Sequence, residues 1–217
     1  MSTLDTPTLL DVIRASRVVA VIRGDSAEHA ADAARILFRE GIRLVEIALT
    51  TPGTLDAIAS VVPDVPAGSY LGAGTVLTLE DVDAVIAAGA TFIVTPAVTE
   101  AVPYAAGLGV PVLAGAFTAT ESYEAWRQGA AAVKLFPGSA AGPGYLKALT
   151  EPFPDIPFLA VGGMGLEQLA QYVAAGALGI GAGGPLVGNG ARGGSADGLA
   201  ERARAFVSAA RELEEPR

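Results

Sequence analysis

Short apolar segments alternate with helix-like segments along almost the entire 217-residue chain. The apolar segments are rich in Val, Ile, Leu and Ala, and are bounded by Gly or Pro, as expected for buried strands. They occupy 18–22, 43–49, 69–73, 91–95, 110–114, 131–136, 157–161 and 178–182. Eight strand-then-helix units predict parallel strands covered by helices. In a chain of this length they favour a single (β/α)8 TIM barrel over residues 1–217.

The intervening segments predict helices that begin at capping residues and end at glycines. A short leading helix is expected over 1–16, capped by Thr6 or Thr8, and the next helix follows Ser26. Further helices are expected at 54–62, 79–88, 99–107, 119–128, 143–150, 166–175 and 196–213, with a loose tail at 214–217. An open doubly wound sheet is the alternative, but no Gly-x-Gly-x-x-Gly follows the first strand.

Composition narrows the classes of partner. The formal net charge of −9 argues against nucleic acids and anionic membranes. The chain has no cysteine and one histidine, so we expect no disulfide, no cofactor and no His-rich metal site, although an all-carboxylate magnesium site stays open. It has no apolar run of 18 residues and no basic-then-apolar leader, so a cytoplasmic protein is the expectation.

One expected strand contains a lysine. The segment 130–137 reads AAAVKLFP, and Lys134 is one of only two lysines beside twelve arginines. A lysine in an apolar strand is desolvated, which lowers its pKa and frees a nucleophilic amine. Such an amine can form a Schiff base with a carbonyl substrate. The alternative is a lysine at a strand end that reaches water or pairs with a carboxylate.

A faint repeat places a carboxylate in register with this lysine. Several expected strands follow a glycine that ends a helix, namely Gly41, Gly89, Gly109, Gly129 and Gly176. The fifth residues after these glycines are Glu46, Val94, Ala114, Lys134 and Gly181. Glu46 and Lys134 then hold equivalent positions on strands 2 and 6, and their side chains are expected to meet inside the barrel. Glu46 is a candidate acid/base, with a structural ion pair as the alternative.

Polar and glycine-rich segments fall where the mouth of a barrel would be. Gly162 and Gly163 follow strand 7, and Gly183 and Gly184 follow strand 8, which is where barrels often bind phosphate through backbone N–H groups. Tight loop geometry is the alternative reading of these glycines. Arg23 follows strand 1 and is a candidate to bind a carboxylate group of the substrate. The alternative is that Arg23 is an ordinary surface residue. Thr75 follows strand 3 and is expected at the mouth of the barrel, with an ordinary helix-capping residue as the alternative. The single histidine, His29, falls in a helix and is expected to be solvated.

Several motifs resemble the class I 2-keto-3-deoxy-6-phosphogluconate and -phosphogalactonate (KDPG/KHG) aldolase family over about residues 18–210. The motifs are Val45-Glu46-Ile47, Gly72-Ala73-Gly74-Thr75-Val76-Leu77, Val94-Thr95-Pro96, Val133-Lys134-Leu135-Phe136-Pro137 and Val161-Gly162-Gly163. The resemblance implies a homotrimeric (β/α)8 barrel that cleaves a phosphorylated 2-keto-3-deoxy sugar acid into pyruvate and glyceraldehyde 3-phosphate.

The resemblance also implies roles for individual residues. Lys134 is then the Schiff-base lysine and Glu46 the acid/base. Thr75, Pro96 and Phe136 line the pyruvate end, and the four glycines after strands 7 and 8 hold the phosphate.

The sequence differs from the gluconate-type pattern in four places. Three of the differences resemble the galactonate branch, and the fourth removes a residue expected to bind the phosphate. Thr50 stands where gluconate-type enzymes commonly have an arginine for the pyruvate carboxylate, and Arg23 resembles its replacement in galactonate-type enzymes. Val161 stands where a threonine is common, and the segment 136–143 also resembles the galactonate branch. Gly184 replaces a serine used for phosphate, which leaves open how strictly phosphate is required.

Two other functions remain open at the level of sequence. One is a phosphosugar isomerase or epimerase on the same barrel, with Lys134 acting only through its charge. The other is a non-catalytic barrel that binds phosphate. Pyruvate-dependent inactivation by borohydride separates the aldolase from both.

Overall fold

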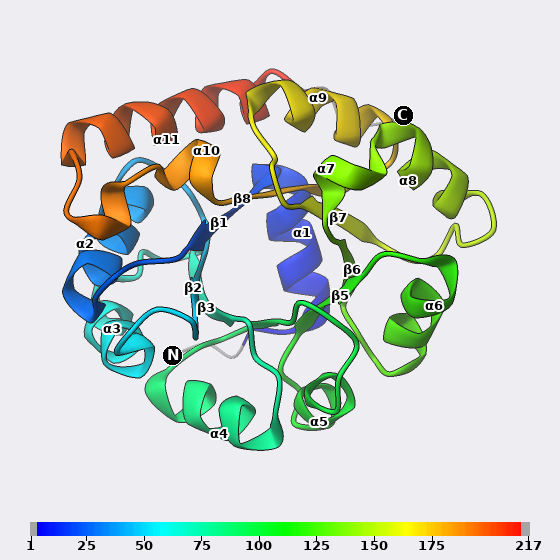
Figure 1. Cartoon of the computed structure of the whole chain (residues 1–217), viewed down its shortest axis with the longest axis horizontal. Helices are drawn as coiled ribbons and strands as arrows, with labels where there is room; N and C mark the ends of the chain where they lie inside the picture. The colour runs from blue at the N-terminus through cyan, green and yellow to red at the C-terminus, as the bar shows by residue number, and fades with distance from the viewer. Residues whose placement is uncertain (1–3, 214–217) are drawn as a thin grey trace.

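Eight parallel strands close into a barrel in chain order, which confirms the predicted TIM barrel (Figure 1). The computed structural model describes residues 4–213. The strands are β1 (Val18–Ile22), β2 (Leu44–Ala48), β3 (Tyr70–Gly74), β4 (Ile93–Val94), β5 (Val112–Ala116), β6 (Ala132–Leu135), β7 (Phe158–Val161) and β8 (Gly179–Ala182). All eight strands therefore point their carboxyl ends toward one mouth, where barrel active sites are built.

A ring of helices surrounds the strands (Figure 1). The helices are α1 (Thr6–Ser16), α2 (Ala27–Arg39), α3 (Thr54–Val61), α4 (Leu79–Ala88), α5 (Ala101–Gly107), α6 (Ala119–Arg127), α7 (Gly138–Ala141), α8 (Pro143–Thr150), α9 (Leu166–Ala174), α10 (Gly184–Val187) and α11 (Ala196–Arg211). Two 3-10 turns are η1 (Val62–Asp64) and η2 (Gly190–Arg192). The tail expected at 214–217 lies outside the described residues. None of the described helices is long and apolar enough to cross a membrane.

Capping side chains set where the helices begin. Ser26 caps α2 as predicted, since its hydroxyl accepts from the backbone N–H of His29. The predicted cap of α1 was wrong: Asp5 precedes that helix, and its carboxylate accepts from the backbone N–H of Thr8 at 2.9 Å. An ionised carboxylate accepts more strongly than the threonine hydroxyls beside it, and it also favours the positive end of the helix.

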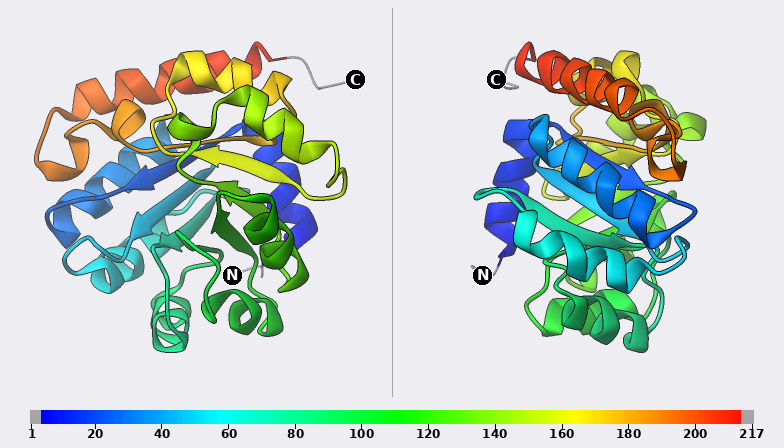
Figure 2. Two further views of the ribbon diagram at one scale, coloured as in Figure 1. Left: turned by 45° about the vertical axis from the view of Figure 1, so that its right-hand side comes forward. Right: turned by 90° about the vertical axis from the view of Figure 1, so that its left-hand side faces the viewer.

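The core has two layers on either side of the barrel wall. Inward-facing side chains such as Leu44, Phe92 and Leu159 form one cluster with Leu9 and Ile13 of α1. Helix α1 lies across the amino-terminal end of the barrel, as both views in Figure 2 show, and so closes the end opposite the mouth. The outward-facing strand residues pack against the surrounding helices in a larger cluster.

The repeat that places Glu46 and Lys134 in register fails at one strand. Ala114 packs in the outer layer, whereas its neighbour Leu113 faces the barrel interior. In β5 the inward-facing Leu113 is the fourth residue after Gly109, so the fifth residue points to the opposite face of the sheet. Val94 faces inward as the count requires.

The sequence did not predict the short elements at the mouth. Helix α7 follows β6, and α10 with η2 follows β8, where continuous loops were expected. Each is only one turn long, which is too short for hydrophobic periodicity to reveal. These turns shape the wall of the mouth beside β7 and β8.

Candidate active site

A cavity of about 350 Å³ opens at the mouth of the barrel toward β1, β6, β7 and β8. Three of its side chains are cationic, and most of its other residues are glycines or valines. It is lined by Val21, Arg23, Lys134, Phe136, Val161, Gly162, Gly163, Gly181, Gly183, Gly184, Val187, Gly188 and Arg192. A concave site with a few convergent charges is where a small anionic ligand would bind.

Lys134 lies on the floor of this cavity. It belongs to β6, and its residue is only 3% exposed. The Nζ atom lies 5.1 Å from the centre of the Phe136 ring. Burial is the main reason that the pKa of Lys134 lies below its ordinary value; the Glu46 carboxylate opposes this effect and Arg23 adds to it. A larger share of the amine is therefore neutral near physiological pH, the form required of a nucleophile.

Glu46 enters the barrel from β2, which stands opposite β6 in the ring of eight strands. It is 2% exposed, and its Oε2 atom has no hydrogen-bond partner among the described residues. Burial raises its pKa, while Lys134 and Arg23 hold the pKa down. A β-carbon at Gly74 would lie 2.9 Å from the carboxyl carbon of Glu46, so the glycine leaves the space that the carboxylate fills.

Lys134 and Glu46 share the barrel interior without touching. Each perturbs the pKa of the other, yet the described structure contains no ion pair between them within 4.0 Å. Both side chains therefore lie inside the barrel, as predicted, although they form no direct ion pair in the described structure. Two buried ionisable groups held apart leave room for a substrate atom or a water molecule between them.

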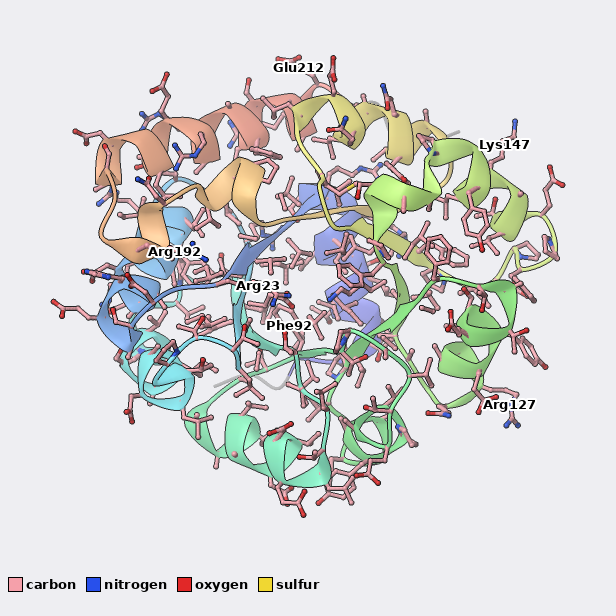
Figure 3. All side chains as sticks on the ribbon, viewed as in Figure 1. Arg23, Phe92, Arg127, Lys147, Arg192 and Glu212 are labelled. Atoms are coloured by element: carbon pink, nitrogen blue, oxygen red, sulfur yellow. The ribbon has the colours of Figure 1, made fainter. Side chains whose placement is uncertain are left out.

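Arg23 extends over the centre of the mouth (Figure 3). It follows β1 and is exposed, and its Nη1 atom lies 3.4 Å from the Thr50 hydroxyl. Its charge reaches both Lys134 and Glu46, as their pKa values show. Lys147, the other lysine, lies on the outer ring of helices and does not line the cavity (Figure 3).

Four glycines form the wall beside β7 and β8. Gly162 and Gly163 have φ values of 99° and 76°, a conformation that favours glycine. A β-carbon at Gly163 would lie 2.9 Å from the Ser139 side chain. In the described structure the backbone N–H groups of Gly163, Gly183 and Gly184 donate to no other part of the chain. Free N–H groups that face a cavity are donors for an anion.

The other residues singled out from the sequence divide into two groups. Phe136 and Val161 line the cavity, and Val161 is 6% exposed with its side chain packed over Gly181. Thr75 and Pro96 are half-buried but do not line this cavity, because they follow β3 and β4 while the cavity opens toward β6, β7, β8 and β1. Thr75 has a φ of 60°, unusual for a residue with a branched side chain.

His29 is partly exposed on α2 and lies outside the cavity. Its Nδ1 atom lies 2.7 Å from Asp25 Oδ1, and this hydrogen bond is the main cause that raises the pKa of His29. His29 is therefore at the surface, as expected, and is paired there with Asp25. Within the described residues, no three His, Asp or Glu side chains gather closely enough to hold a metal ion.

Sequence reasoning did not find Arg192. It ends η2 and lines the cavity together with Val187 and Gly188. A signal was present, because Arg192 is the one charged residue in the glycine-rich segment 188–194 that follows strand 8.

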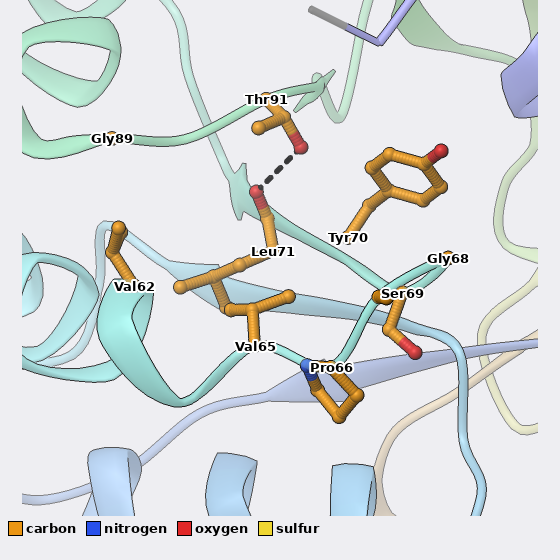
Figure 4. Close-up of a pocket in the computed structure, with 10 residues that line it drawn as sticks. Val62, Val65, Pro66, Gly68, Ser69, Tyr70, Leu71, Gly89 and Thr91 are labelled. Carbon is orange, nitrogen blue, oxygen red and sulfur yellow. Dashed lines mark hydrogen bonds between the residues drawn. The ribbon is translucent and has the colours of Figure 1, made fainter. Parts of the chain in front are cut away.

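A second hollow, of about 160 Å³, lies at the other end of the barrel (Figure 4). It is lined by the segment 65–71 that leads into β3, by Val62 and Gly89, and by Thr91, whose hydroxyl donates to the Leu71 carbonyl. Its wall carries no carboxylate, lysine, arginine or histidine. It therefore lacks the chemistry of the mouth.

Comparison with known proteins assigns the chain to a family. The model of the KDPG and KHG aldolases matches residues 9–195. The chain belongs to the KDPG and KHG aldolase family. The match covers every strand and every residue of the candidate site, so the barrel mouth described above is the part of the molecule that the family has in common with this chain.

Individual members of the KDPG/KHG aldolase family are similar over most of the chain. A 2-dehydro-3-deoxy-6-phosphogalactonate aldolase of Escherichia coli is 40% identical over 90% of this chain and 95% of its own length. A 2-dehydro-3-deoxy-phosphogluconate aldolase of Treponema pallidum is 37% identical over 77% and 80%. The solved structure described as native KDPGal aligns with a TM-score of 0.84 and 40% identity, over 90% of this chain and 94% of that chain.

Proposed function

We propose that the protein is a class I aldolase that reversibly cleaves a 2-keto-3-deoxy-6-phospho sugar acid into pyruvate and glyceraldehyde 3-phosphate. Membership of the KDPG/KHG aldolase family supports the reaction type and makes the protein a carbon–carbon lyase. The observation that carries the mechanism is a buried lysine that lines a cavity with two arginines and lies within electrostatic reach of a buried carboxylate.

Lys134 supplies the nucleophile. Its neutral amine attacks the C2 carbonyl of the substrate, and loss of water gives a protonated Schiff base. The C3–C4 bond then breaks, its electron pair moves into the iminium, and the C4 hydroxyl loses its proton as the aldehyde forms. The remaining enamine takes a proton at C3, and hydrolysis of the Schiff base releases pyruvate and restores the lysine.

Glu46 moves the protons in these steps. Its unpartnered Oε2 atom is free to accept a proton from the C4 hydroxyl, directly or through a water. A carboxyl with a raised pKa can also return that proton to C3 of the enamine. The separation of more than 4.0 Å from Lys134 leaves the space that these transfers need.

The remaining residues would hold the two ends of the substrate. Arg23 would bind the carboxylate next to the keto group, since it is the cation whose charge reaches Lys134 and Glu46. Phe136 would pack against the pyruvate part. Thr75 and Pro96 would support this end from strands β3 and β4. The free N–H groups of Gly163, Gly183 and Gly184, together with the neighbouring Gly162, would face the phosphate.

We further propose that the galactonate-type epimer is a good substrate. Val161 lines the cavity between the lysine and the glycine-rich wall, where the middle of the substrate would lie. Valine offers no hydrogen bond with which to select one configuration of the C4 hydroxyl. The 40% identity to a phosphogalactonate aldolase supports the same preference.

The resemblance to the family also supports two proposals about the state of the protein. We propose a homotrimer in the cytoplasm. Size-exclusion chromatography with light scattering should give a mass about three times that of the chain, and a monomer would contradict this proposal.

Lys134→Ala tests the proposed function. The variant should retain its far-UV circular dichroism and melting behaviour but lose pyruvate release from both phosphorylated epimers. Lys147→Ala, on the outer face of α8, is the matched control and should turn over like the wild type. Pyruvate release by the Lys134 variant would contradict the mechanism, and conversion of a phosphosugar without release of pyruvate would favour the isomerase.

A further inference from the structure

We propose that Arg192 binds the distal phosphate of the aldehyde half of the substrate and selects phosphorylated aldehydes over neutral ones. This inference rests on the proposed aldolase function and adds a specificity residue to it. Arg192 lines the same cavity as Lys134, on the wall formed after β8.

The first argument is the place of Arg192 within the cavity. Arg23 perturbs the pKa values of both Lys134 and Glu46, so it lies close to the catalytic floor. Arg192 perturbs neither. It instead helps, after the hydrogen bond from His29, to lower the pKa of Asp25 at the rim. The two arginines also stand at different places across the mouth, Arg23 near its centre and Arg192 to one side (Figure 3), as expected for groups that hold the two anionic ends of one substrate.

The second argument is that the Arg192 side chain is unoccupied. Among the described residues it forms no side-chain hydrogen bond and no ion pair within 4.0 Å. Most other described arginines hold a carboxylate or a backbone carbonyl, as Arg35, Arg43 and Arg202 do. An arginine that lines a cavity with its five donors unused is ready to bind a phosphate bidentately.

The third argument is the empty wall at Gly184. A β-carbon built there would meet no protein atom within 4 Å, so the chain leaves room at this part of the wall. The neighbouring backbone N–H groups have no acceptor within the described chain. An anion placed there would receive backbone donors from one side and the guanidinium from the rim.

The fourth argument concerns how Arg192 is held in place. The backbone N–H of Arg192 donates to Asn189 at 2.9 Å, and that of Asp25 donates to Ala191 at 3.3 Å. Arg202 of α11 donates to the carbonyls of Leu186 and Val187. These bonds fix η2 and α10 against β1 and α11, so the exposed guanidinium extends from a supported backbone.

The test compares aldehydes in the synthetic direction with pyruvate in excess. For Arg192→Ala we expect kcat/KM for glyceraldehyde 3-phosphate to fall about 10- to 100-fold, the usual effect of losing a hydrogen bond to a charged group. The values for unphosphorylated glyceraldehyde and for glyoxylate should change less than twofold, since neither carries an anion that reaches the rim. Arg192→Lys should recover part of the loss.

Two further variants sharpen the comparison. Arg127→Ala removes an exposed arginine on the outer face of α6 and should leave every substrate unchanged (Figure 3). Gly184→Ser in the Arg192→Ala background adds a hydroxyl in the open part of the wall and should recover part of the activity toward glyceraldehyde 3-phosphate. Equal losses with phosphorylated and neutral aldehydes, or no loss with either, would overturn the role of Arg192.

A binding measurement separates this inference from the proposed function. Inorganic phosphate should bind to the wild-type protein in calorimetry, weaken as salt is raised, and bind at least 10-fold more weakly to Arg192→Ala. If no aldehyde is turned over, the proposed function fails, yet this titration still decides whether Arg192 holds phosphate. Equal affinity for phosphate in the two proteins would overturn the inference.

Discussion

Replacing Glu46 by glutamine separates Schiff-base formation from proton transfer. The amide has nearly the same shape as the carboxylate, so it fits the space left by Gly74. It cannot take a proton from the C4 hydroxyl or return one to C3. Attack by Lys134 on pyruvate does not need that carboxylate to the same degree, because the lysine pKa is already lowered by burial.

The magnitude follows from the role of the group. A positioned general acid/base contributes about 10²–10⁴-fold, or about 3–5 kcal/mol of transition-state stabilisation. We expect kcat to fall by this factor in the Glu46→Gln variant. The sign of the pH effect follows as well: the carboxylate raises the pKa of Lys134, so its removal lowers that pKa further. Schiff-base trapping by the variant should therefore persist to lower pH than in the wild type.

The assay pairs steady-state pyruvate release with borohydride trapping over a range of pH. Glu167→Gln, an exposed carboxylate in the first turn of α9, is the matched control and should behave as the wild type. Turnover of Glu46→Gln near the wild-type rate, with a stable fold, would show that Glu46 is structural. A trapping profile moved to higher pH would refute the proposed electrostatic coupling between the two residues.

Three further outcomes are expected. Gly74→Ala places a methyl group against the Glu46 carboxylate, so kcat should fall about 10- to 100-fold, as expected for a misplaced catalytic group. The control is Gly144→Ala, where a β-carbon meets nothing within 4 Å, and it should leave kcat unchanged. Wild-type activity in Gly74→Ala would mean that the carboxylate position is not critical. Val161→Thr should shift the kcat/KM ratio of the two epimers toward the gluconate type by about 1–2 kcal/mol, the worth of one added hydrogen bond, and an unchanged ratio would show that Val161 does not face C4. Because burial lowers the pKa of Lys134, wild-type trapping should extend to lower pH than an ordinary lysine amine allows, and it should decline as the pH falls through that lowered pKa. A decline centred at the ordinary pKa of a lysine side chain would contradict the burial effect.

The sequence predicts the barrel well because its signals are local and repeated. Each strand is an apolar run bounded by glycine or proline, and Gly41 and Gly89 end their helices with positive φ as expected. The register of Glu46 with Lys134 could also be predicted, since both lie at the same distance from such a glycine. The failure at Ala114 shows the limit of this count, because a shift of one residue between the glycine and the strand reverses the face of every side chain in the strand.

The wall of the site was harder to predict. Arg192 reaches the cavity only because η2 packs against the loop after β1, and a contact between residues so distant in sequence leaves no periodic signal. The resemblance to the family placed Thr75 and Pro96 at the pyruvate end, yet they follow strands β3 and β4, on the other side of the mouth from this cavity. Which strand ends line one cavity depends on the shape of the loops between them.

The most direct test of the central proposal is to find the residue that pyruvate modifies. Wild-type protein incubated with pyruvate and borohydride should gain one reduced adduct per chain by intact mass, and peptide mapping should place it on Lys134. Lys134→Ala should gain none, while Lys147→Ala should be labelled as the wild type. An adduct on Lys147, or no adduct in the wild type, would contradict the assignment of Lys134 as the Schiff-base lysine.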